Sequence, residues 1–257
     1  MRPKKSLGQN FLMHRQIAER IVQAAEVTKD DTVMEIGPGT GMLTRVLLGT
    51  AKKVIAVEAD GELVAELNTT FATEIADGRL TLIHDDIRNV DPQIFGSYRL
   101  VANIPYYITG EIIRMFLTTN AKPRSMTLLV QKEVAERIAR SKKESVLSIA
   151  VKTYGTPRYC FTVPRGAFRP APNVDSAVLT ITDIQAPFSS LEEEEWFFTV
   201  LKTGFMHKRK QLAKNLEEIA PGERVKEALM EAEVSATVRP EDVPLSSWKA
   251  IARKVRI

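Results

Sequence analysis

The stretch Glu35-Ile36-Gly37-Pro38-Gly39-Thr40-Gly41 decides the fold expected for this chain of 257 residues. It follows the short apolar run Thr32 to Ile36 and precedes a stretch with helical periodicity, so it predicts a turn from a buried strand into a helix. Glycine suits such a loop because the backbone must turn tightly and approach a ligand closely. The loop therefore predicts the start of a nucleotide-binding α/β domain.

The spacing of the glycines indicates which class of ligand the loop binds. A dinucleotide fingerprint places its glycines as GxGxxG, whereas Gly37, Gly39 and Gly41 form GxGxG. We interpret these three glycines as candidate cofactor-binding residues. Their spacing favours an adenosyl ligand that lacks a pyrophosphate.

Outward from the loop, apolar runs typical of strands alternate with amphipathic helical patterns such as Glu111 to Leu117 and Lys132 to Arg140. This alternation predicts an α/β fold with a parallel sheet covered on both faces. The last two runs are expected to form an antiparallel edge pair. The predicted strands after the first are Lys53 to Glu58, Leu80 to His84, Leu100 to Asn103, Met126 to Val130, Tyr159 to Val163 and Val174 to Ile181.

The character of the sequence changes after Ile184. Gln185 to Ser190 is typical of a linker, and helical periodicity begins at Leu191, with Pro221-Gly222 and Pro240 as breakers. We therefore predict two domains: residues 1–184 as the cofactor-binding catalytic domain, and residues 185–257 as a small helical domain that selects the substrate.

Composition excludes several classes of protein. Hydrophobic residues make up 44% and charged residues 26% of the chain, and no apolar run approaches the roughly 20 residues that span a bilayer. The basic start lacks the apolar region of a secretory signal, so we expect a cytoplasmic protein without a membrane role. A single cysteine excludes an intramolecular disulfide, and the three histidines are far apart, so we expect no metal site.

Positive charge is concentrated in two places. The net charge is +4, which favours a polyanionic partner without proving one. Two local basic patches are candidate nucleic-acid contacts. Their members are Lys4 and Lys5 near the start, and Lys208, Arg209, Lys210 and Lys214 in the helical region.

Two carboxylates stand at predicted strand ends. Glu58 ends the second strand, where it can accept both ribose hydroxyls of an adenosine, and Asp86 follows the third strand, where it can accept the adenine amino group. Because the carboxyl ends of parallel strands meet at one edge of a sheet, the glycine loop and both carboxylates are expected to form one cofactor cleft.

The fourth strand ends in Asn103-Ile104-Pro105-Tyr106, and these four residues are the candidate catalytic group. An adenine N6 amine is a poor nucleophile because its lone pair is delocalised into the ring. The Asn103 side-chain carbonyl and a backbone carbonyl near Ile104 or Pro105 would accept its hydrogens and free the lone pair. Pro105 stiffens the loop, and Tyr106 offers a ring on which an extruded base can stack. An activated sulfonium methyl donor needs no nucleophilic side chain, so positioning supplies much of the rate.

At these residues the sequence resembles the small-subunit ribosomal RNA adenine dimethyltransferases, a family that methylates two adjacent adenosines near the 3′ end of 16S rRNA. The resemblance covers essentially the whole first domain and the start of the second. It is carried by Lys5 to Leu12, the glycine loop, Glu58, Asp86, Asn103 to Tyr106, Gln131 to Val134, Phe168 to Val178 and Phe205 to Leu216.

The resemblance implies a Rossmann-like class I methyltransferase sheet, S-adenosylmethionine as cofactor, and 16S rRNA in the small ribosomal subunit or its precursor as partner of a monomer. Phe168 would join Tyr106 in sandwiching the target adenine. The residues that would close over or line the cofactor pocket are Gln9, Asn10, Leu12, Gly37, Glu58, Asp86 and Asn103.

The chain departs from the family pattern in two places. Glu144 to Ser148 replaces a usual Tyr-Gly pair before Leu-Ser, so the loop after Arg140 is expected to differ in shape. Gly110-Glu111 replaces a small residue and a proline, although Thr109 is still expected to cap the next helix.

Two other functions remain open at this point. The large-subunit rRNA adenine methylases that confer macrolide resistance share the glycine loop and the Asn-Ile-Pro-Tyr motif. A non-catalytic rRNA-binding assembly factor would keep the fold without turnover, which the intact pocket residues disfavour.

We predict that Lys208, Arg209 and Lys210 contact phosphate. Replacing each by glutamine should flatten the dependence of RNA affinity on salt by about 0.7 to 0.9 in logarithmic slope for each phosphate interaction removed, because fewer counterions are released. Binding titrations at several salt concentrations measure this slope. Exchanges that keep the charge, Lys208→Arg, Arg209→Lys and Lys210→Arg, are the control and should keep the slope. An unchanged slope in the glutamine variants would mean that these residues face solvent without contacting phosphate.

Overall fold

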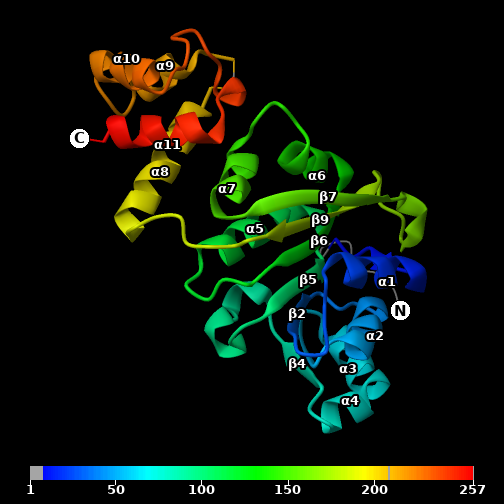
Figure 1. The fold of residues 1–257 in the computed structure, drawn as a ribbon. Helices are drawn as coiled ribbons and strands as arrows, with labels where there is room; N and C mark the ends of the chain where they lie inside the picture. Colours follow the sequence, from blue (N-terminus) through cyan, green and yellow to red (C-terminus); the bar gives the residue numbers. More distant parts are fainter. Residues whose placement is uncertain (1–7, 208, 257) are drawn as a thin grey trace. The chain divides into compact units, whose positions relative to one another are not determined.

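The structure is a computed structural model that describes residues 8–207 and 209–256 (Figure 1). The chain divides into two compact units. The first contains the described residues up to Ala135 together with Gly155–Ile184, and the second contains Glu136–Tyr154 together with the described residues from Gln185 onward. Ile184 thus ends the first unit, while the segment Glu136–Tyr154 belongs to the second. The assignment of catalysis to one unit and RNA selection to the other stays a prediction.

A seven-stranded sheet forms the centre of the first unit, with the order β4-β3-β2-β5-β6-β9-β7. The five strands from β4 to β6 are parallel, and β9 is antiparallel to both of its neighbours. This arrangement confirms the Rossmann-like α/β fold. The strands are β2 (Thr32–Ile36), β3 (Lys53–Glu58), β4 (Leu80–His84), β5 (Arg99–Asn103), β6 (Met126–Gln131), β7 (Thr156–Val163) and β9 (Ser176–Thr182).

The apolar runs form strands here because the sheet is buried on both faces. In β2 and β3 every residue after the first is buried, as expected when helices cover a parallel sheet on each side. The predicted antiparallel pairing of the last two strands is confirmed, but β9 is an interior strand between β6 and β7. It also begins at Ser176, two residues later than predicted.

A second, two-stranded sheet was not predicted. It pairs β1 (Phe11–Leu12) with β8 (Phe168–Arg169) in antiparallel fashion, so that Leu12 lies opposite Phe168. The Met13 amide extends the pairing by donating to the Ala167 carbonyl at 2.9 Å. The start of the described chain is therefore fastened to the connection between β7 and β9.

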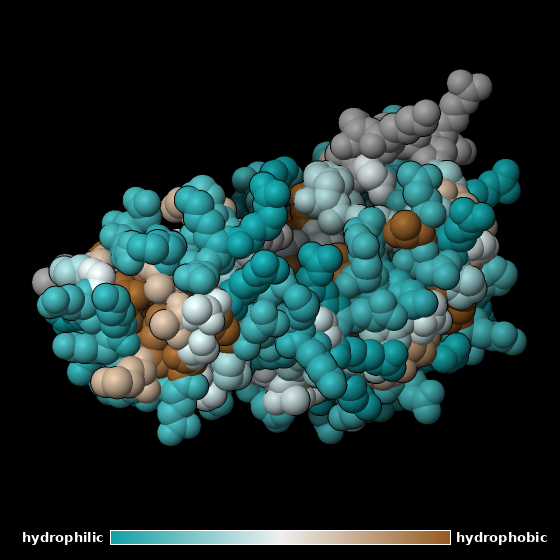
Figure 2. Space-filling view, turned by 90° about the horizontal axis from the view of Figure 1, so that it is seen from above, coloured by the Kyte–Doolittle hydropathy of each residue, from teal (hydrophilic) through white to brown (hydrophobic). Residues whose placement is uncertain are grey.

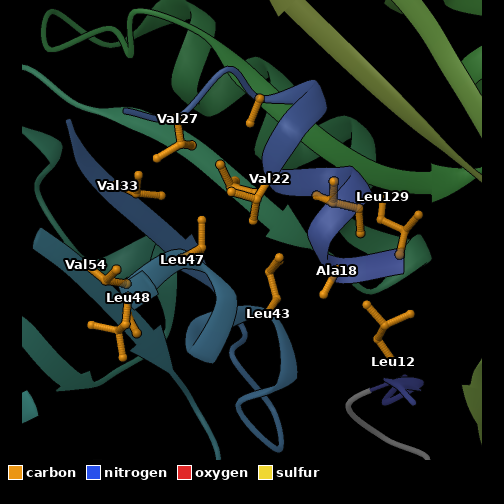
Figure 3. Close-up of a cluster of buried hydrophobic side chains, with 14 of the residues drawn as sticks. Leu12, Ala18, Val22, Val27, Val33, Leu43, Leu47, Leu48, Val54 and Leu129 are labelled. Atoms are coloured by element: carbon orange, nitrogen blue, oxygen red, sulfur yellow. The ribbon is translucent and has the colours of Figure 1, made fainter. Parts of the chain in front are cut away.

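Helices α1 (Arg15–Ala24) and α2 (Met42–Thr50) pack against each other and bury one apolar cluster with the sheet (Figure 3). Ala18, Leu47 and Val33 are fully buried in it. Burying one such leucine or valine side chain stabilises the fold by about 1.5 to 3 kcal/mol, so this cluster holds the glycine loop between β2 and α2. The other helices and turns of the first unit are α3 (Gly61–Thr70), α4 (Ala72–Ala76), η2 (Ile87–Asn89), η3 (Pro92–Phe95), η4 (Tyr106–Ile108), α5 (Thr109–Thr118) and η5 (Arg165–Ala167), and α6 (Lys132–Ala139) crosses the boundary.

The start of α5 corrects one expectation. Thr109 does not cap the helix, because it is the first helical residue and Ile108 takes the N-cap position without a side-chain bond. The Thr109 hydroxyl is buried and has no hydrogen-bond partner among the described residues.

The second unit is all helical, as predicted for the C-terminal part. Its core surrounds the fully buried Trp248, whose ring stacks on Phe205 at 5.4 Å between centroids. Gly204 must be glycine, because a Cβ atom there would overlap the Trp248 ring. The helices are α7 (Val146–Tyr154), α8 (Leu191–Gly204), α9 (Leu212–Leu216), α10 (Gly222–Glu231) and α11 (Leu245–Lys254), with the short turn η6 (Pro240–Asp242).

The atypical segment Glu144 to Ser148 forms the start of α7. The Ser148 amide donates to Ser145 Oγ at 3.1 Å, and the Ser145 amide donates to Ser148 Oγ at 2.7 Å. This is the reciprocal bonding of a capping box, with serine in place of the usual acidic or amide residue. Glu144 also pairs with Lys152 at 2.6 Å, so the departure from the family pattern is a well-bonded helix start.

The molecular face shown in Figure 2 is predominantly hydrophilic, with small apolar patches. None of the helices among the described residues has the length and apolar character needed to cross a membrane.

The edge of the sheet where the strands begin is held by a buried ion pair. Asp31, whose side chain is 2% exposed, accepts from Arg99 Nε at 3.0 Å and pairs with Arg124. The same carboxylate accepts from the amide and hydroxyl of Thr28. Arg99 extends the network to the Ala25 carbonyl and Ser125 Oγ, so it links the segments that enter β2, β5 and β6.

We predict that Asp31→Ala lowers the free energy of unfolding by about 3 kcal/mol, because it leaves the mostly buried Arg99 without its carboxylate. Urea unfolding followed by circular dichroism measures the change. Asp30→Ala, at the exposed neighbouring position, is the matched control and should change stability by less than about 0.5 kcal/mol. Equal stability of the two variants would show that the network contributes nothing net.

Candidate cofactor and substrate site

A cavity opens at the edge of the sheet where the parallel strands end. It encloses about 1120 Å³, including open solvent at its mouth. The structure brings most of the predicted site residues to this one cavity. Those that line it are Gln9, Asn10, Leu12, Gly37, Gly39, Glu58, Asp86, Asn103, Ile104, Pro105 and Tyr106.

The three glycines of the loop have different roles. All have positive φ angles, which L side chains rarely adopt. A Cβ atom at Gly37 would meet nothing within 4 Å, whereas one at Gly39 would lie 2.9 Å from the Phe11 ring. Gly41 does not line the cavity; it is the N-cap of α2, and a Cβ atom there would lie 2.5 Å from Phe71. Its need for glycine is thus explained by packing.

Glu58 is a buried carboxylate held by the backbone. Its Oε2 accepts the Gly39 amide at 3.2 Å, and its Oε1 accepts the Asp60 amide at 3.0 Å. Burial raises its pKa, while these two amide donors favour the charged form and lower it. Each oxygen keeps lone pairs for another donor, so Glu58 is placed to accept hydroxyl groups from a ligand.

Glu35 also lines the cavity, a role that was not predicted from the sequence. It is 1% exposed, and its Oε2 has no hydrogen-bond partner among the described residues. Burial raises its pKa to about 8, with a smaller upward contribution from the neighbouring Glu58. This upward shift of the pKa favours the protonated form of Glu35, which limits the negative charge beside Glu58.

Asp86 has a cationic partner that the sequence did not reveal. Arg88 lies two residues further along, lines the same cavity, and donates from Nε to Asp86 Oδ1 at 2.9 Å. Its Nη2 donates to the other oxygen. Hydrogen bonds from Arg88 lower the pKa of Asp86, so the carboxylate is charged and its two oxygens are fixed in direction.

Asn103 connects the end of β5 to the segment that starts the described chain. Its Nδ2 donates to the Asn10 carbonyl at 3.0 Å. Gln9 fastens the same segment on the other side by donating to Asp60 Oδ2 at 3.0 Å. Leu12 in addition pairs with Phe168. Because of these three interactions, the segment from Gln9 to Leu12 is held at both sides of the cavity that it lines.

Tyr106 and Phe168 differ in placement. Tyr106 is half-buried at the cavity, and its hydroxyl lies 2.6 Å from Oγ of the fully buried Ser176 on β9. Burial raises its pKa, so the hydroxyl is neutral and the ring is held by this hydrogen bond. Phe168 is 4% exposed in the apolar cluster and does not line the cavity. Its part in an adenine sandwich stays a prediction.

The predicted RNA-binding residues are only partly visible. Lys4, Lys5 and Lys208 lie outside the described residues. Arg209 and Lys210 are exposed in the second unit. Lys214 is exposed and pairs with Glu217 at 3.0 Å. Their contact with RNA stays a prediction.

The donor set of the cavity fits S-adenosylmethionine. Carboxylates stand at two successive strand ends, and there is open space above Gly37. The assignment of Glu58 to ribose hydroxyls and of Asp86 to an adenine amino group stays a prediction. Among residues 8–207 and 209–256, no group of three or more histidine, cysteine or acidic residues is placed to hold a metal ion.

A sheet of five parallel strands followed by the antiparallel β9, with a glycine loop after β2, is the fold of the class I methyltransferases, which the similar solved structures share. Residues 1–255 match the family model described as ribosomal RNA adenine dimethylase. The chain belongs to this family. It is an S-adenosylmethionine-dependent ribosomal RNA methyltransferase.

Curated relatives extend over nearly the whole chain. Ribosomal RNA small subunit methyltransferase A of Lactococcus lactis subsp. lactis is 40% identical over 263 residues, which cover 97% of this chain and 88% of that protein. The protein of the same name from Dehalococcoides mccartyi is 38% identical over 261 residues, which cover 98% of this chain and 88% of that protein.

Solved structures are similar over the same length. The 23S rRNA methyltransferase ErmE has a TM-score of 0.77 and 26% identity, covering 96% of this chain and 99% of that one. A dimethyladenosine transferase from Plasmodium falciparum has a TM-score of 0.76 and 25% identity, and the match covers 94% of this chain and 95% of that one.

We predict that the protonated state of Glu35 makes stability depend on pH. Below its usual pKa of 4.5 the carboxyl is protonated in both folded and unfolded chains. Between pH 4.5 and about pH 8 only the folded chain keeps the proton. The free energy of unfolding therefore falls as pH rises in this range, by up to about 1.4 kcal/mol per pH unit. Above 8 this contribution is lost and the slope ends.

Glu35→Gln keeps the shape without the titration, so the variant should lack this part of the slope. Urea unfolding of both proteins between pH 5 and 9 measures the difference. Glu66→Gln, at an exposed position of α3, should keep the wild-type slope. The same slope in Glu35→Gln as in the wild type would mean that Glu35 is ionised in the folded protein.

Proposed function

We propose that this protein dimethylates the exocyclic N6 of two adjacent adenosines near the 3′ end of 16S rRNA, within the small ribosomal subunit or its precursor. The observation that carries the chemistry is the fixed orientation of the Asn103 amide. Because Nδ2 donates to the Asn10 carbonyl, Oδ1 is the group that remains to accept a hydrogen from a substrate amine. No partner for Oδ1 is found among the described residues.

Asn103 and the turn after it prepare the amine. Oδ1 accepts one hydrogen of the N6 amine, and a backbone carbonyl at Ile104 or Pro105 accepts the other. The first acceptor is on the last residue of β5 and the second is on the short turn from β5 to η4, so little rearrangement is needed when charge develops on the nitrogen. Bound S-adenosylmethionine supplies an electrophilic methyl group, and the protein's task is to hold the amine in line with it.

The cofactor would be held by groups already in place. Glu58 accepts the ribose hydroxyls, and Asp86, fixed by Arg88, accepts the adenine amino group. The segment from Gln9 to Leu12 covers the cavity and excludes water. These assignments rest on strand-end position, cavity lining and hydrogen-bond capacity.

A second methyl transfer needs no further catalytic group. A monomethylated N6 keeps one hydrogen for Asn103 and a lone pair for attack. Tyr106, anchored by Ser176, holds a face of the base and leaves the amine edge open. Dimethylation is therefore the expected product.

The choice of RNA rests on sequence outside the shared chemistry. The segment from Phe168 to Val178 and the segment from Gly204 to Leu216 resemble the small-subunit enzymes, and curated relatives of that name are 38 to 40% identical over nearly the whole chain. A non-catalytic assembly factor is disfavoured because the cofactor-pocket residues are intact and come together at one cavity. That the enzyme acts as a monomer in the cytoplasm is part of the proposal.

The test offers small-subunit particles and naked large-subunit rRNA separately with labelled S-adenosylmethionine, then identifies the nucleosides by mass after digestion. Dimethyladenosine from two neighbouring positions of the small-subunit RNA is expected. Asn103→Ala should lower methyl transfer by at least about 100-fold while RNA affinity changes much less, because its task is to orient the amine.

Two results would contradict the proposal. Dimethyladenosine confined to the large-subunit RNA would assign the enzyme to the macrolide-resistance type. Monomethyladenosine alone would refute the argument for a second transfer.

A further inference from the structure

Tyr107 is an exposed aromatic residue beside the cavity. It directly follows Tyr106 in η4 and lines the same cavity, yet its side chain is 66% exposed. Its hydroxyl has no hydrogen-bond partner among the described residues, in contrast to that of Tyr106, which is fixed by Ser176. The ring therefore contributes little to the packing of its own unit.

The Tyr107 ring is nevertheless supported. A Cβ atom at Gly8 would lie 3.1 Å from Tyr107 Cε1 and 3.2 Å from Cδ1, so the ring rests against the backbone at this glycine. Gly8 also has a positive φ of 59°, which favours glycine there independently. A ring that is held on one side and open on the other loses little conformational freedom when a flat group stacks on it.

We propose that Tyr107 binds the nucleobase next to the target adenosine, so that Tyr106 and Tyr107 hold two neighbouring bases of the RNA. This inference rests on the proposed function, in which the substrate carries two adjacent adenosines. A base extruded for chemistry leaves its neighbour without full stacking, and an aromatic side chain can replace the missing stack.

The cofactor is the competing partner for Tyr107, because Asp86 and Arg88 line the same cavity. Tyr107 keeps two thirds of its surface open, which leaves room for a group as large as a nucleobase. Separate measurement of cofactor and RNA binding distinguishes the two partners.

The experiment compares Tyr107→Leu, Tyr107→Phe and Tyr107→Trp. Leucine keeps apolar bulk against Gly8 but offers no flat ring, whereas phenylalanine and tryptophan keep the ring. Tyr107→Leu should raise KM for small-subunit RNA roughly tenfold, within the range expected for removal of one base–aromatic stack, and should leave the Kd for S-adenosylmethionine unchanged. The phenylalanine and tryptophan variants should restore the wild-type KM. Ile94→Ala is the control, since Ile94 is also 66% exposed but does not line the cavity.

A second measurement locates the contact on the RNA. With a substrate that carries an abasic nucleotide next to the target adenosine, wild type and Tyr107→Leu should have the same KM, because the stacking partner is missing. Equal KM values on the intact RNA, or a weaker Kd for S-adenosylmethionine with unchanged RNA KM, would overturn the inference. If wild-type enzyme does not dimethylate small-subunit RNA in the same assay, the proposed function fails instead.

Discussion

The parallel pairing of β2 with β3 and β5 is the constraint on which the site depends. Its register places Ile36 opposite Val57 on one side and Ala102 on the other. Because backbone hydrogen bonds align these strand ends, the next residues along each strand emerge at one edge. The glycine loop, Glu58 and Asn103 meet there for this reason, and a slip of one residue would turn their side chains to the opposite face.

Much of this arrangement can be predicted from sequence because it rests on local pattern. β2, β3 and β4 match their predicted bounds, since each is a continuous apolar run between polar or glycine residues. The pairing of β1 with β8 could not be predicted, because two-residue strands have no periodicity and their partners lie more than 150 residues apart.

The same contrast holds within the site. Strand-end carboxylates such as Glu58 are visible in the sequence, because position after an apolar run is a local property. The raised pKa of Glu35, the pairing of Asp86 with Arg88 and the burial of Phe168 depend on three-dimensional surroundings. The absence of the expected Thr109 cap has the same origin, since the turn η4 runs directly into α5.

The Asn103 side chain makes different interactions through its amide nitrogen and its amide oxygen. Its nitrogen donates to the Asn10 carbonyl in the segment that lines the cofactor cavity, and its oxygen is the acceptor that we propose for the substrate amine. The two ends of an amide cannot be set independently, so the direction of this oxygen is fixed by the segment at Asn10. In the proposed mechanism, the position of that segment and the activation of the amine are therefore coupled.

The second unit is assembled from two separate pieces of chain, Glu136–Tyr154 and the region after Gln185. Its core includes Ile149 from the first piece, and Tyr154 stacks on Phe198 from the second at 6.1 Å between ring centroids. A fragment that ends at Ile184 would consequently not be a well-packed domain, because the apolar face of α7 would be left uncovered. An exchange of the helical part with that of a relative would therefore have to carry both pieces of chain.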